Sequence, residues 1–487
     1  MTKTKFKVLL AAAELTPLAK VGGLADVIGA LPKALWGLKQ DVRIVIPKYG
    51  IINPKKYLLK KIKSNITVRF EGKNEKINLY QTHLPDSKVI VYLIDHPKYL
   101  GAGDVYISAD ASSDGSITEA HRFTFFTAAI PEIFKPLGWT PDVLHCHDWH
   151  VGMLAPLVKL KKIKTPLLFT VHNLAYQGVY EKKRVFKMLG LTSQTANQLT
   201  SLKIHAHSKY LNYLEQSILN ADFINTVSPN YAKEIITKEY GCGQEKNLKS
   251  RKKELSGILN GIDTERFNPE TDPDIKFKFD HNSLNKKIKN KLALQKEAGF
   301  KPSSKTLLIS VVGRLTEQKG FDIMLPVMEK ILKLKIQFVL LGTGDKSYEA
   351  EFKKLSKKYN NFKAYLKFDA KLAQRIYASS DLFLMPSRFE PCGLGQMIAM
   401  RYGALPLVRA TGGLKDTVTD LKKATGTGFV FSEYHKKTLY NTIVRASRFY
   451  YNHALRWQNA QRRAMQQDFS WTNSAKKYLK IYTKLLK

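Results

Sequence analysis

The sequence is short of cysteine and of long apolar stretches, and each shortage excludes a class of protein. Its 487 residues include only three cysteines, far apart and odd in number, so we expect no disulfide framework: Cys146, Cys242 and Cys392. No apolar run approaches the ~18 residues that a membrane span requires. The chain passes from Met1–Lys5 directly into a strand-like run, without the cleavage site of a signal peptide. These features predict a protein of the reducing cytoplasm, with no membrane partner.

Acidic residues are also scarce. The chain has 41 Asp and Glu against 79 Lys and Arg, a formal net charge of +38. Such a balance suggests a nucleic-acid partner, but the lysines are dispersed and no zinc-finger or RNA-recognition signature accompanies them. Runs such as 60–63 and 159–162 are interleaved with apolar residues, as on solvated helix faces. Because net charge bears on solubility and nonspecific binding more than on function, we predict no specific nucleic-acid partner.

The chain is too long for one core, and its length suggests roughly two to three domains. In the first half, apolar strand-like runs alternate with helical segments. This alternation predicts a parallel sheet covered on both faces, as in a doubly wound α/β domain. The expected strands are 6–12, 42–46, 89–94, 143–146, 167–171 and 223–227, and the expected helices are 25–35, 118–134 and 201–219.

The second half repeats this pattern after Asp263. A polar stretch, 267–301, is interpreted as a connection followed by an opening helix. Beyond it we expect strands at 307–312, 337–341, 364–368, 382–385 and 405–408, with helices at 321–334 and 372–378. The second half therefore predicts another doubly wound α/β domain.

One loop, 388–396, combines a carboxylate with a glycine after the strand 382–385. Glu390 would lie at the carboxyl end of that strand, where open α/β sheets bind ligands. Gly393 would open the next helix, whose N-terminus offers free N–H groups and a positive dipole to a phosphate. The alternative is an ordinary strand–helix turn with a surface glutamate.

Cations and glycines at other strand ends favour phosphate binding. Arg314 and Lys319 share one loop, where Arg would give bidentate contacts to a diphosphate and Lys a compact charge. The turn 411–414 resembles the turn 22–24 of the first half, which follows Lys20. Neither turn has the G-x-G-x-x-G spacing of a dinucleotide site. Each cation alone is typical of a solvated surface, but together they favour the phosphate interpretation.

Histidines follow another expected strand. His145 and His147 would point to one face of it, with His150 close behind. Zinc is one interpretation, but no further Cys or His lies at a metal-site spacing nearby. Histidines that hydrogen-bond a polyol, or that are satisfied within the core, are the two alternatives.

These motifs, in this order, resemble the bacterial glycogen synthase and plant starch synthase family. The resemblance runs nearly end to end, through the stretches 20–27, 147–150, 170–178, 259–263, 314–320, 386–396, 402–418 and 464–471. It implies a retaining hexosyltransferase that moves glucose from ADP-glucose to the non-reducing end of an α-1,4-glucan such as glycogen. It also implies the GT-B fold, an α/β class with two Rossmann-like doubly wound domains and an inter-domain cleft.

The resemblance implies domain boundaries as well. An N-terminal domain, 1–263, would form the acceptor side. A C-terminal domain, 264–465, would hold the nucleotide-sugar donor. The tail, 466–487, would form a helix that crosses back to the first domain.

The resemblance further implies a role for individual residues. The catalytic residues would be Glu390, His172, Arg314 and Lys319. The donor-binding residues would be Lys20, Gly22, Gly23, Asn173, Phe368, Gly393, Leu394, Thr411 and Gly412. The residues lining the acceptor side and the cleft would be Asp26, His147, Asp148, Tyr176 and Gln177.

No cofactor and no metal are expected beside the nucleotide sugar. Negative charge that develops on a leaving phosphate needs preorganised cations and helix N-termini, which the motifs supply. Some positions depart from the family pattern: the segment 101–120 is unusual, and Ile398 stands where many other retaining GT-B enzymes carry a ribose-binding Glu. Phe368 lacks the usual hydroxyl but can still stack on adenine, and Glu215 replaces a usual Lys. A transferase that makes a small glucoside, an inactive glucan-binding relative and a nucleic-acid binder remain alternatives, and the choice between ADP-glucose and UDP-glucose stays open.

Overall fold

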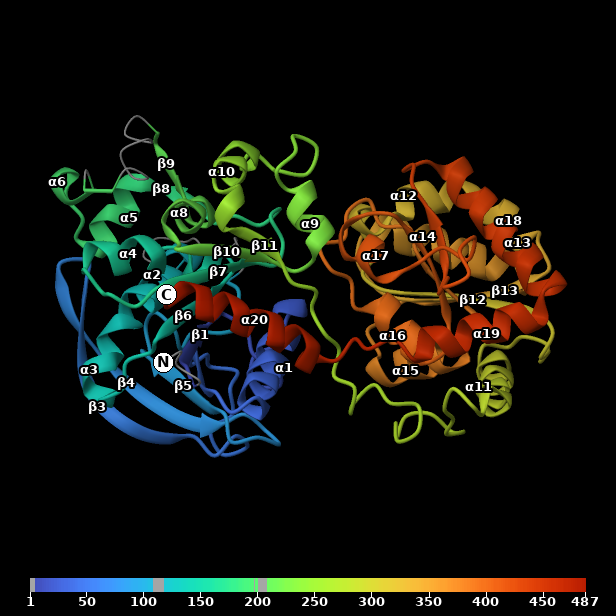
Figure 1. Cartoon of the computed structure of the whole chain (residues 1–487), viewed down its shortest axis with the longest axis horizontal. Coiled ribbons are helices and arrows are strands. Elements are labelled where there is room, and N and C mark those ends of the chain that lie inside the picture. The colour runs from blue at the N-terminus through green and yellow to red at the C-terminus, as the bar shows by residue number, and fades with distance from the viewer. Residues whose placement is uncertain (1–4, 108–117, 197, 200–207) are drawn as a thin grey trace. The chain divides into compact units, whose positions relative to one another are not determined.

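The structure is a computed structural model that describes residues 5–107, 118–196, 198–199 and 208–487, and it consists of two compact units (Figure 1). Unit 1 comprises Met1–Val227, Ala232–Gly261 and Trp471–Lys487. Unit 2 comprises Ser228–Tyr231 and Ile262–Ser470. Each unit has its own sheet and core, as the alternating pattern of strands and helices predicts.

Nine of the described strands of unit 1 form one sheet, in the order β11-β10-β7-β6-β1-β2-β5-β4-β3, and β8 (Val179–Glu181) and β9 (Tyr210–Asn212) form a separate pair. The nine are β1 (Lys7–Ala11), β2 (Asp41–Pro47), β3 (Lys60–Phe70), β4 (Lys73–His83), β5 (Ile90–Asp95), β6 (Val143–His147), β7 (Leu167–Val171), β10 (Phe223–Thr226) and β11 (Leu255–Gly257). Neighbours from β11 to β5 are parallel, whereas β3 and β4 are antiparallel. The central strands β1, β6 and β7 are buried almost throughout, because helices cover both faces of a parallel sheet.

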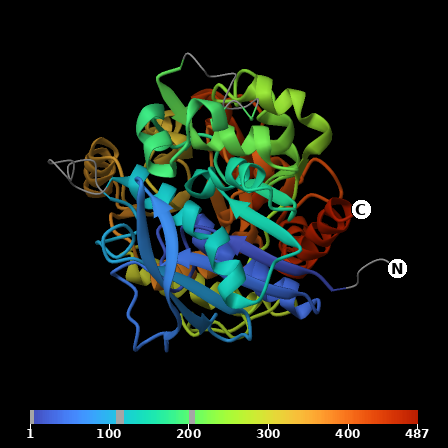
Figure 2. The same ribbon diagram turned by 90° about the vertical axis from the view of Figure 1, so that its left-hand side faces the viewer.

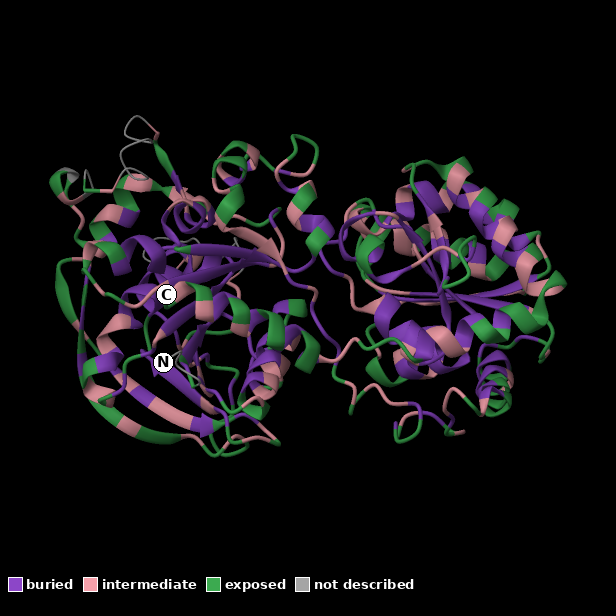
Figure 3. Ribbon diagram, in the orientation of Figure 1, coloured by how far each residue is buried: buried purple, intermediate pink, exposed green. Residues whose placement is uncertain are grey.

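The β3–β4 hairpin corrects one expectation. The lysine run 60–63 belongs to β3 and not to a helix face. Along β3 the side chains of Ile66, Val68 and Phe70 are buried while those between them are exposed, the period of two that a strand with one solvated face shows. Figure 2 brings this long hairpin to the front of unit 1, and Figure 3 shows its outer strand as largely exposed.

The helices of unit 1 fill the connections between strands. They are α1 (Gly23–Gly37), α2 (Glu119–Ala129), α3 (Phe134–Leu137), α4 (Leu154–Leu160), α5 (Lys182–Leu189), α6 (Ser193–Ala196), α8 (Tyr213–Asn220), α10 (Glu245–Ser250) and α20 (Trp471–Leu485); α9 (Pro229–Glu234) spans the boundary between the units. Pro131 interrupts the helix expected over 118–134. The helix expected over 201–219 is wrong at 210–212, which form β9 (Tyr210–Asn212) against β8 (Val179–Glu181), and residues 201–207 lie outside the described part.

The C-terminal helix α20 packs on α1 within unit 1 (Figure 1). Its buried residues Trp471, Tyr478 and Tyr482 belong to the same apolar cluster as strands β1 and β2. The segment that follows unit 2 in the chain is therefore part of the core of unit 1.

Unit 2 has one all-parallel sheet of six described strands, in the order β14-β13-β12-β15-β16-β17. They are β12 (Leu307–Val312), β13 (Ile336–Leu341), β14 (Phe362–Tyr365), β15 (Leu382–Met385), β16 (Leu405–Arg409) and β17 (Phe429–Phe431). Numbered along unit 2, this order is 3-2-1-4-5-6, that of a Rossmann sheet. The strand expected at 364–368 ends at Tyr365, so Phe368 lies in the loop beyond it.

The helices of unit 2 cover both faces of this sheet. They are α11 (Leu284–Glu297), α12 (Phe321–Met324), α13 (Met328–Leu332), α14 (Lys346–Lys358), α15 (Ala370–Ser379), α16 (Gly395–Arg401), α17 (Gly412–Thr417), α18 (Lys436–Asn452) and α19 (Ala454–Met465). Pro326 lies in a short 3-10 segment that divides the helix expected over 321–334. Helix α16 begins at Gly395, two residues later than expected, because Gly393 has a φ of 73° in the left-handed region.

The described residues include no helix that combines the length and the apolar character needed to cross a membrane.

Candidate active site

The sheet topology of each unit marks one place for a ligand. In unit 2 the order in which successive strands are added to the sheet reverses between the parallel neighbours β12 and β15, and in unit 1 it reverses between β1 and β6. Open α/β sheets bind ligands in the crevice at the carboxyl ends of the two strands that flank such a switch point. Many of the candidate residues lie in the four loops that follow these strands, and the others follow β7, β14 and β16.

In unit 2 the loops after β12 and β15 meet through an ion pair. The Nζ atom of Lys319 lies 2.7 Å from Oε2 of Glu390. The hydroxyl of Ser387 donates to the same oxygen at 3.0 Å. Glu390 is buried and Lys319 is partly buried, so the pair is shielded from solvent. The structure thus joins two residues that are 71 positions apart in the sequence.

Arg314 and two backbone amides are free to bind a ligand. The side chain of Arg314 is exposed and has no hydrogen-bond or ion-pair partner among the described residues. The N–H groups of Gly393 and Leu394 likewise have no acceptor in the described part of the chain. A guanidinium and unpaired amides at one switch point form a set of donors for an anion.

The start of α17 lies against the loop of Glu390. The N–H of Gly413 donates to the carbonyl of Glu390 at 3.1 Å. A Cβ atom at Gly412 would lie only 1.9 Å from that carbonyl oxygen, and φ there is 44°. Only glycine allows this approach. The glycine turn begun by Thr411 is therefore brought to Glu390, as its place after β16 suggests.

In unit 1 the loop after β1 is organised by Glu14, a residue that the sequence analysis missed. Its buried carboxylate accepts from the N–H groups of Val21 at 2.9 Å and Gly22 at 2.6 Å. The hydroxyl of Tyr106 donates to its other oxygen at 2.6 Å. The sequence does indicate Glu14, because it is a carboxylate just beyond a buried strand. The N–H of Gly22 is thus engaged within the protein.

Lys20 and Asp26 face each other across the start of α1. Their Nζ and Oδ1 atoms are 2.6 Å apart, and both side chains are substantially exposed. Gly23 is the first residue of α1, and a Cβ atom there would meet nothing within 4 Å. The packing of unit 1 therefore leaves open space beside Gly23.

Three histidines form a stack behind the loops after β6 and β7. His145 and His147 point to one side of β6, as expected, with ring centroids 4.1 Å apart. His145 is hydrogen-bonded at both nitrogens, to Tyr482 of α20 at 2.9 Å and to Thr170 at 2.8 Å. His147 Nδ1 and His172 Nε2 share a hydrogen bond of 2.9 Å. His145 is therefore a satisfied core residue, and His147 supports His172.

Asp148 holds the loop of His172 in place. Its Oδ1 accepts from the N–H of His172 at 2.7 Å, and Asn173 also donates to it from the backbone. Its own backbone has φ 59° and ψ 175°, a region that residues other than glycine avoid. Burial raises the pKa of Asp148 to about 7, although the two backbone donors oppose this shift.

The histidine rings are neutral at physiological pH. Burial lowers the pKa of His172 to about 3 and that of His150 to about 3. Burial also lowers the pKa of His147 well below its ordinary value, with further contributions from His145 and His172. His172 therefore offers a neutral imidazole, which can donate or accept a hydrogen bond without carrying charge.

Of three other predicted residues, two are exposed to solvent and one is hydrogen-bonded within the protein. Phe368 is 86% exposed, and its ring stacks on no other described aromatic ring. Tyr176 is likewise exposed. Gln177 instead bonds within the protein: its Nε2 donates to the carbonyls of Leu174 at 3.1 Å and Cys242 at 2.8 Å. Gln177 therefore connects its own loop to the segment of Cys242.

Within the described part of the chain, no group of three or more His, Cys, Asp or Glu side chains is arranged to hold a metal ion. The predicted independence from metal remains a prediction.

Comparisons with known proteins agree with this architecture. The profile of the family described as starch synthase catalytic domain matches residues 7–250, and that of glycosyl transferases group 1 matches residues 294–463. Glycogen synthase of Thermosipho africanus is 43% identical, and that of Thermosipho melanesiensis is 41% identical; each comparison covers 99% of both chains.

A solved structure is also similar. It is the catalytic domain of starch synthase IV from Arabidopsis thaliana bound to ADP and acarbose, with a TM-score of 0.88 and 34% identity over 99% of both chains. The expected fold class, α/β with two Rossmann-like GT-B domains, is confirmed. Sequence, topology and full-length similarity together lead to one conclusion: the chain belongs to the glycogen synthase and starch synthase family of glycosyltransferases.

Proposed function

We propose that the protein transfers glucose from ADP-glucose to the non-reducing end of an α-1,4-glucan, with retention of configuration. The family makes it a hexosyltransferase. The starch synthase IV structure contains ADP and acarbose, which supports an adenine nucleotide and a glucan-like sugar as ligands here. The observation that carries the proposal is the set of unpaired donors beside the Lys319–Glu390 pair at the switch point of unit 2.

In this proposal unit 2 binds the donor. Glucosyl transfer leaves negative charge on the departing diphosphate, and fixed cations lower the free energy of that state. Arg314 has its five donors free for the phosphates, and Lys319 adds a compact charge. Glu390 accepts from Lys319 and keeps its ammonium in place. Exposed Phe368 would stack on the base.

Glu390 and His172 would act at the sugar. Positive charge builds at the anomeric carbon as the bond to phosphate breaks, so a carboxylate nearby favours that state. A protonated histidine there would oppose it. Because burial lowers the pKa of His172 to about 3, the imidazole is neutral and can hydrogen-bond a sugar hydroxyl without repelling this charge.

Unit 1 would form the acceptor side and contribute Lys20 to the donor. The N–H of Gly22 is already engaged by Glu14, so the loop would act through Lys20 and the space beside Gly23. Lys20 can leave Asp26 and pair with a phosphate at little cost, because an exposed ion pair contributes little to the free energy of folding. Asp148 and His147 would position His172.

Incorporation of label tests the proposal directly. Purified protein is incubated with glycogen and either ADP-[14C]glucose or UDP-[14C]glucose, with and without EDTA, and polymer-bound label is counted. We expect more label from ADP-glucose, no loss in EDTA, and release of the label as maltose by an exo-acting enzyme specific for α-1,4 bonds. Label found only in a small glucoside would favour the rival transferase. No transfer to any acceptor would contradict the proposal.

A further inference from the structure

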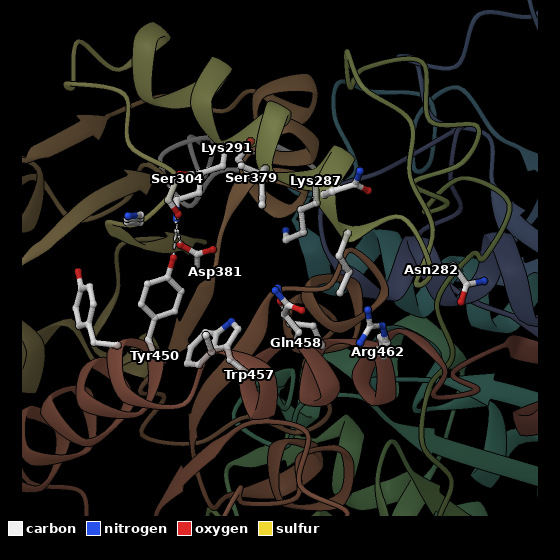
Figure 4. Close-up of a pocket in the computed structure, with 17 residues that line it drawn as sticks. Asn282, Lys287, Lys291, Ser304, Ser379, Asp381, Tyr450, Trp457, Gln458 and Arg462 are labelled. Carbon is white, nitrogen blue, oxygen red and sulfur yellow. Dashed lines mark hydrogen bonds and ion pairs between the residues drawn. The ribbon is translucent and has the colours of Figure 1, made fainter.

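A cavity lies within unit 2, away from the loops described above. Its volume is about 520 Å³, and Figure 4 shows side chains of α11 facing those of α18 and α19 across it. The main polar and aromatic residues that line it are Lys287, Lys291, Asp381, Tyr450, Trp457 and Arg462. This volume suits a small metabolite.

The cavity lies at the opposite end of the two strands that flank the switch point. Asp381 directly precedes β15, and Lys305 lies just before β12. The candidate donor residues follow the carboxyl ends of the same strands. Because β12 has six residues, at roughly 3.3 Å for each, the two places are separated by about 20 Å. The cavity is therefore not part of the donor site.

The lining carries an excess of positive charge. Asp381 is the one acidic residue among the described residues that line the cavity, and it lies 2.6 Å from the Nζ atom of Lys291. It also accepts from the N–H of Leu308 at 2.8 Å. Lys291 donates in addition to Ser304 and Tyr450, so all three of its donors are used.

Lys287 is buried beside the cavity without a carboxylate of its own. It is 4% exposed, and its ammonium donates to the carbonyl of Ala378 at 2.9 Å and, more weakly, to that of Tyr377 at 3.4 Å. One N–H of Lys287 remains for a ligand. Burial lowers the pKa of Lys287 to about 7, a shift that Lys291 reinforces and Asp381 opposes.

Trp457 supplies a donor with no acceptor. Its side chain is 3% exposed, and its Nε1 atom has no hydrogen-bond partner among the described residues. A buried N–H group without an acceptor costs free energy, so such groups are rare unless a ligand or water satisfies them. Figure 4 shows the indole nitrogen on the cavity side of α19.

We propose that this cavity, defined by Lys287, Trp457 and the rim cations Lys305 and Arg462, binds a small phosphorylated metabolite at a place separate from the donor site. All four side chains are donors only, so the ligand must supply acceptors and negative charge, and a phosphate group supplies three acceptor oxygens. The polar side chains of Asn285 and Gln458 also line the cavity, beside the rest of the ligand.

The test uses AMP and ribose 5-phosphate as probes, titrated calorimetrically into the full chain with the donor site saturated by ADP. Both should bind, while ribose and citrate should not. Trp457→Phe retains an aromatic ring against Phe429 and Tyr450 but removes the N–H, and Lys287→Met removes the buried charge. Each should weaken binding of the phosphates by about tenfold or more.

Lys286→Met is the matched control, because Lys286 is the exposed neighbour on α11 and does not line the cavity. It should leave the affinity unchanged. If Lys287→Met does not fold, Arg462→Ala at the rim serves in its place. No saturable binding at millimolar concentrations, equal affinity in the cavity variants and the control, or preference for citrate would overturn the proposal. If the protein does not bind ADP, but the wild type binds the phosphates and Trp457→Phe does not, the proposed function would be refuted and the cavity proposal would stand.

Sulfate provides a second readout, because its charge is constant between pH 6 and 9. Its affinity should fall as pH rises above 7, approaching tenfold per pH unit, since binding requires the protonated form of Lys287. The charged or titratable groups around Lys287 are Lys291, Asp381, Lys305, Arg462, Tyr450 and Tyr451. Lys287→Met should abolish this pH dependence, and an unchanged dependence would contradict the role of Lys287.

Discussion

The ammonium of Lys319 lies 2.7 Å from the carboxylate of Glu390, and this pair joins the two loops at the switch point of unit 2. The contact leaves two of the three ammonium donors for a ligand. It also means that a change at Lys319 leaves Glu390 as a buried carboxylate without its cation. The two residues therefore act as one unit.

Lys319→Ala should lower kcat with ADP-glucose by ~10²–10³, because a preorganised cation for the leaving diphosphate is lost. Initial rates of label transfer to glycogen measure this. Lys330→Ala, an exposed lysine on α13, is the control and should retain full activity. Equal turnover by Lys319→Ala and the wild type would show that Lys319 does not serve the leaving group.

Gly23→Ala should fold normally but bind the donor poorly. A Cβ atom at Gly23 meets nothing within 4 Å, and alanine favours the helix, so the midpoint of thermal unfolding should not fall. If a ligand occupies that space, the methyl group displaces it and kcat/KM drops by about tenfold to a hundredfold. Gly37→Ala, at the other end of α1 with equal room, is the matched control. Normal kinetics in Gly23→Ala would place the ligand elsewhere.

Asp148 should act by positioning the loop of His172. Asp148→Asn keeps an oxygen that accepts from the N–H of His172, whereas Asp148→Ala does not. We expect the alanine variant to lose about a hundredfold in kcat and the asparagine variant much less. Because the pKa of Asp148 is about 7 and a carboxylate is the stronger acceptor, wild-type activity should rise through that pH. The asparagine variant should lack this rise, and an identical pH profile would contradict the assignment.

The buried histidines should make unit 1 sensitive to acid. Their pKa values are lowered by burial, to about 3 for His150 and His172, so below pH 6.5 the unfolded chain binds more protons than the native one. The free energy of unfolding then falls as pH decreases from 6.5. Asp148, with its raised pKa, acts oppositely between about pH 4 and 7, but one carboxyl does not offset three histidines.

Thermal unfolding at pH 7 and pH 4.5 tests this expectation. The midpoint should be lower at pH 4.5, and His147→Gln should reduce the difference. His453→Gln, in an exposed position of unit 2, should not. A midpoint independent of pH would contradict the prediction.

The parallel strands were predictable because each is a short apolar run between polar segments. The limits of 167–171, 307–312 and 382–385 agree with those of β7, β12 and β15. The antiparallel hairpin was not predicted, because its lysines suggested a helix face. In a strand with one solvated face, apolar residues alternate with polar ones. The first half of β3 is largely exposed and polar, so the alternation is visible only from Ile66 onward. Placement of β14 was wrong at its end, since the loop to Phe368 continues the apolar pattern.

For the candidate site too, some features could be predicted from the sequence and others could not. Residues directly after a strand, such as Glu390, could be located from the sequence by the rule for carboxyl ends. Their partners could not, because the pairing of Lys319 with Glu390 depends on the order of strands in the sheet. The expected place of Gln177 on the acceptor side stays a prediction, and the sequence did not reveal that its amide donates to the carbonyls of Leu174 and Cys242. Lys287 was hidden because it is one of several lysines on an amphipathic helix, and only packing buries it.

Because helix α20 is the last element of the chain to be synthesised, unit 1 cannot complete its core until translation ends. Domains generally fold in turn as the chain leaves the ribosome, the N-terminal one first. Here Trp471, Tyr478 and Tyr482 fill the core of unit 1, and they are made only after all of unit 2. The apolar surface along α1 in the nascent first unit therefore stays exposed to solvent until unit 2 has been translated. A chaperone that binds exposed apolar surface would act on the chain during that interval.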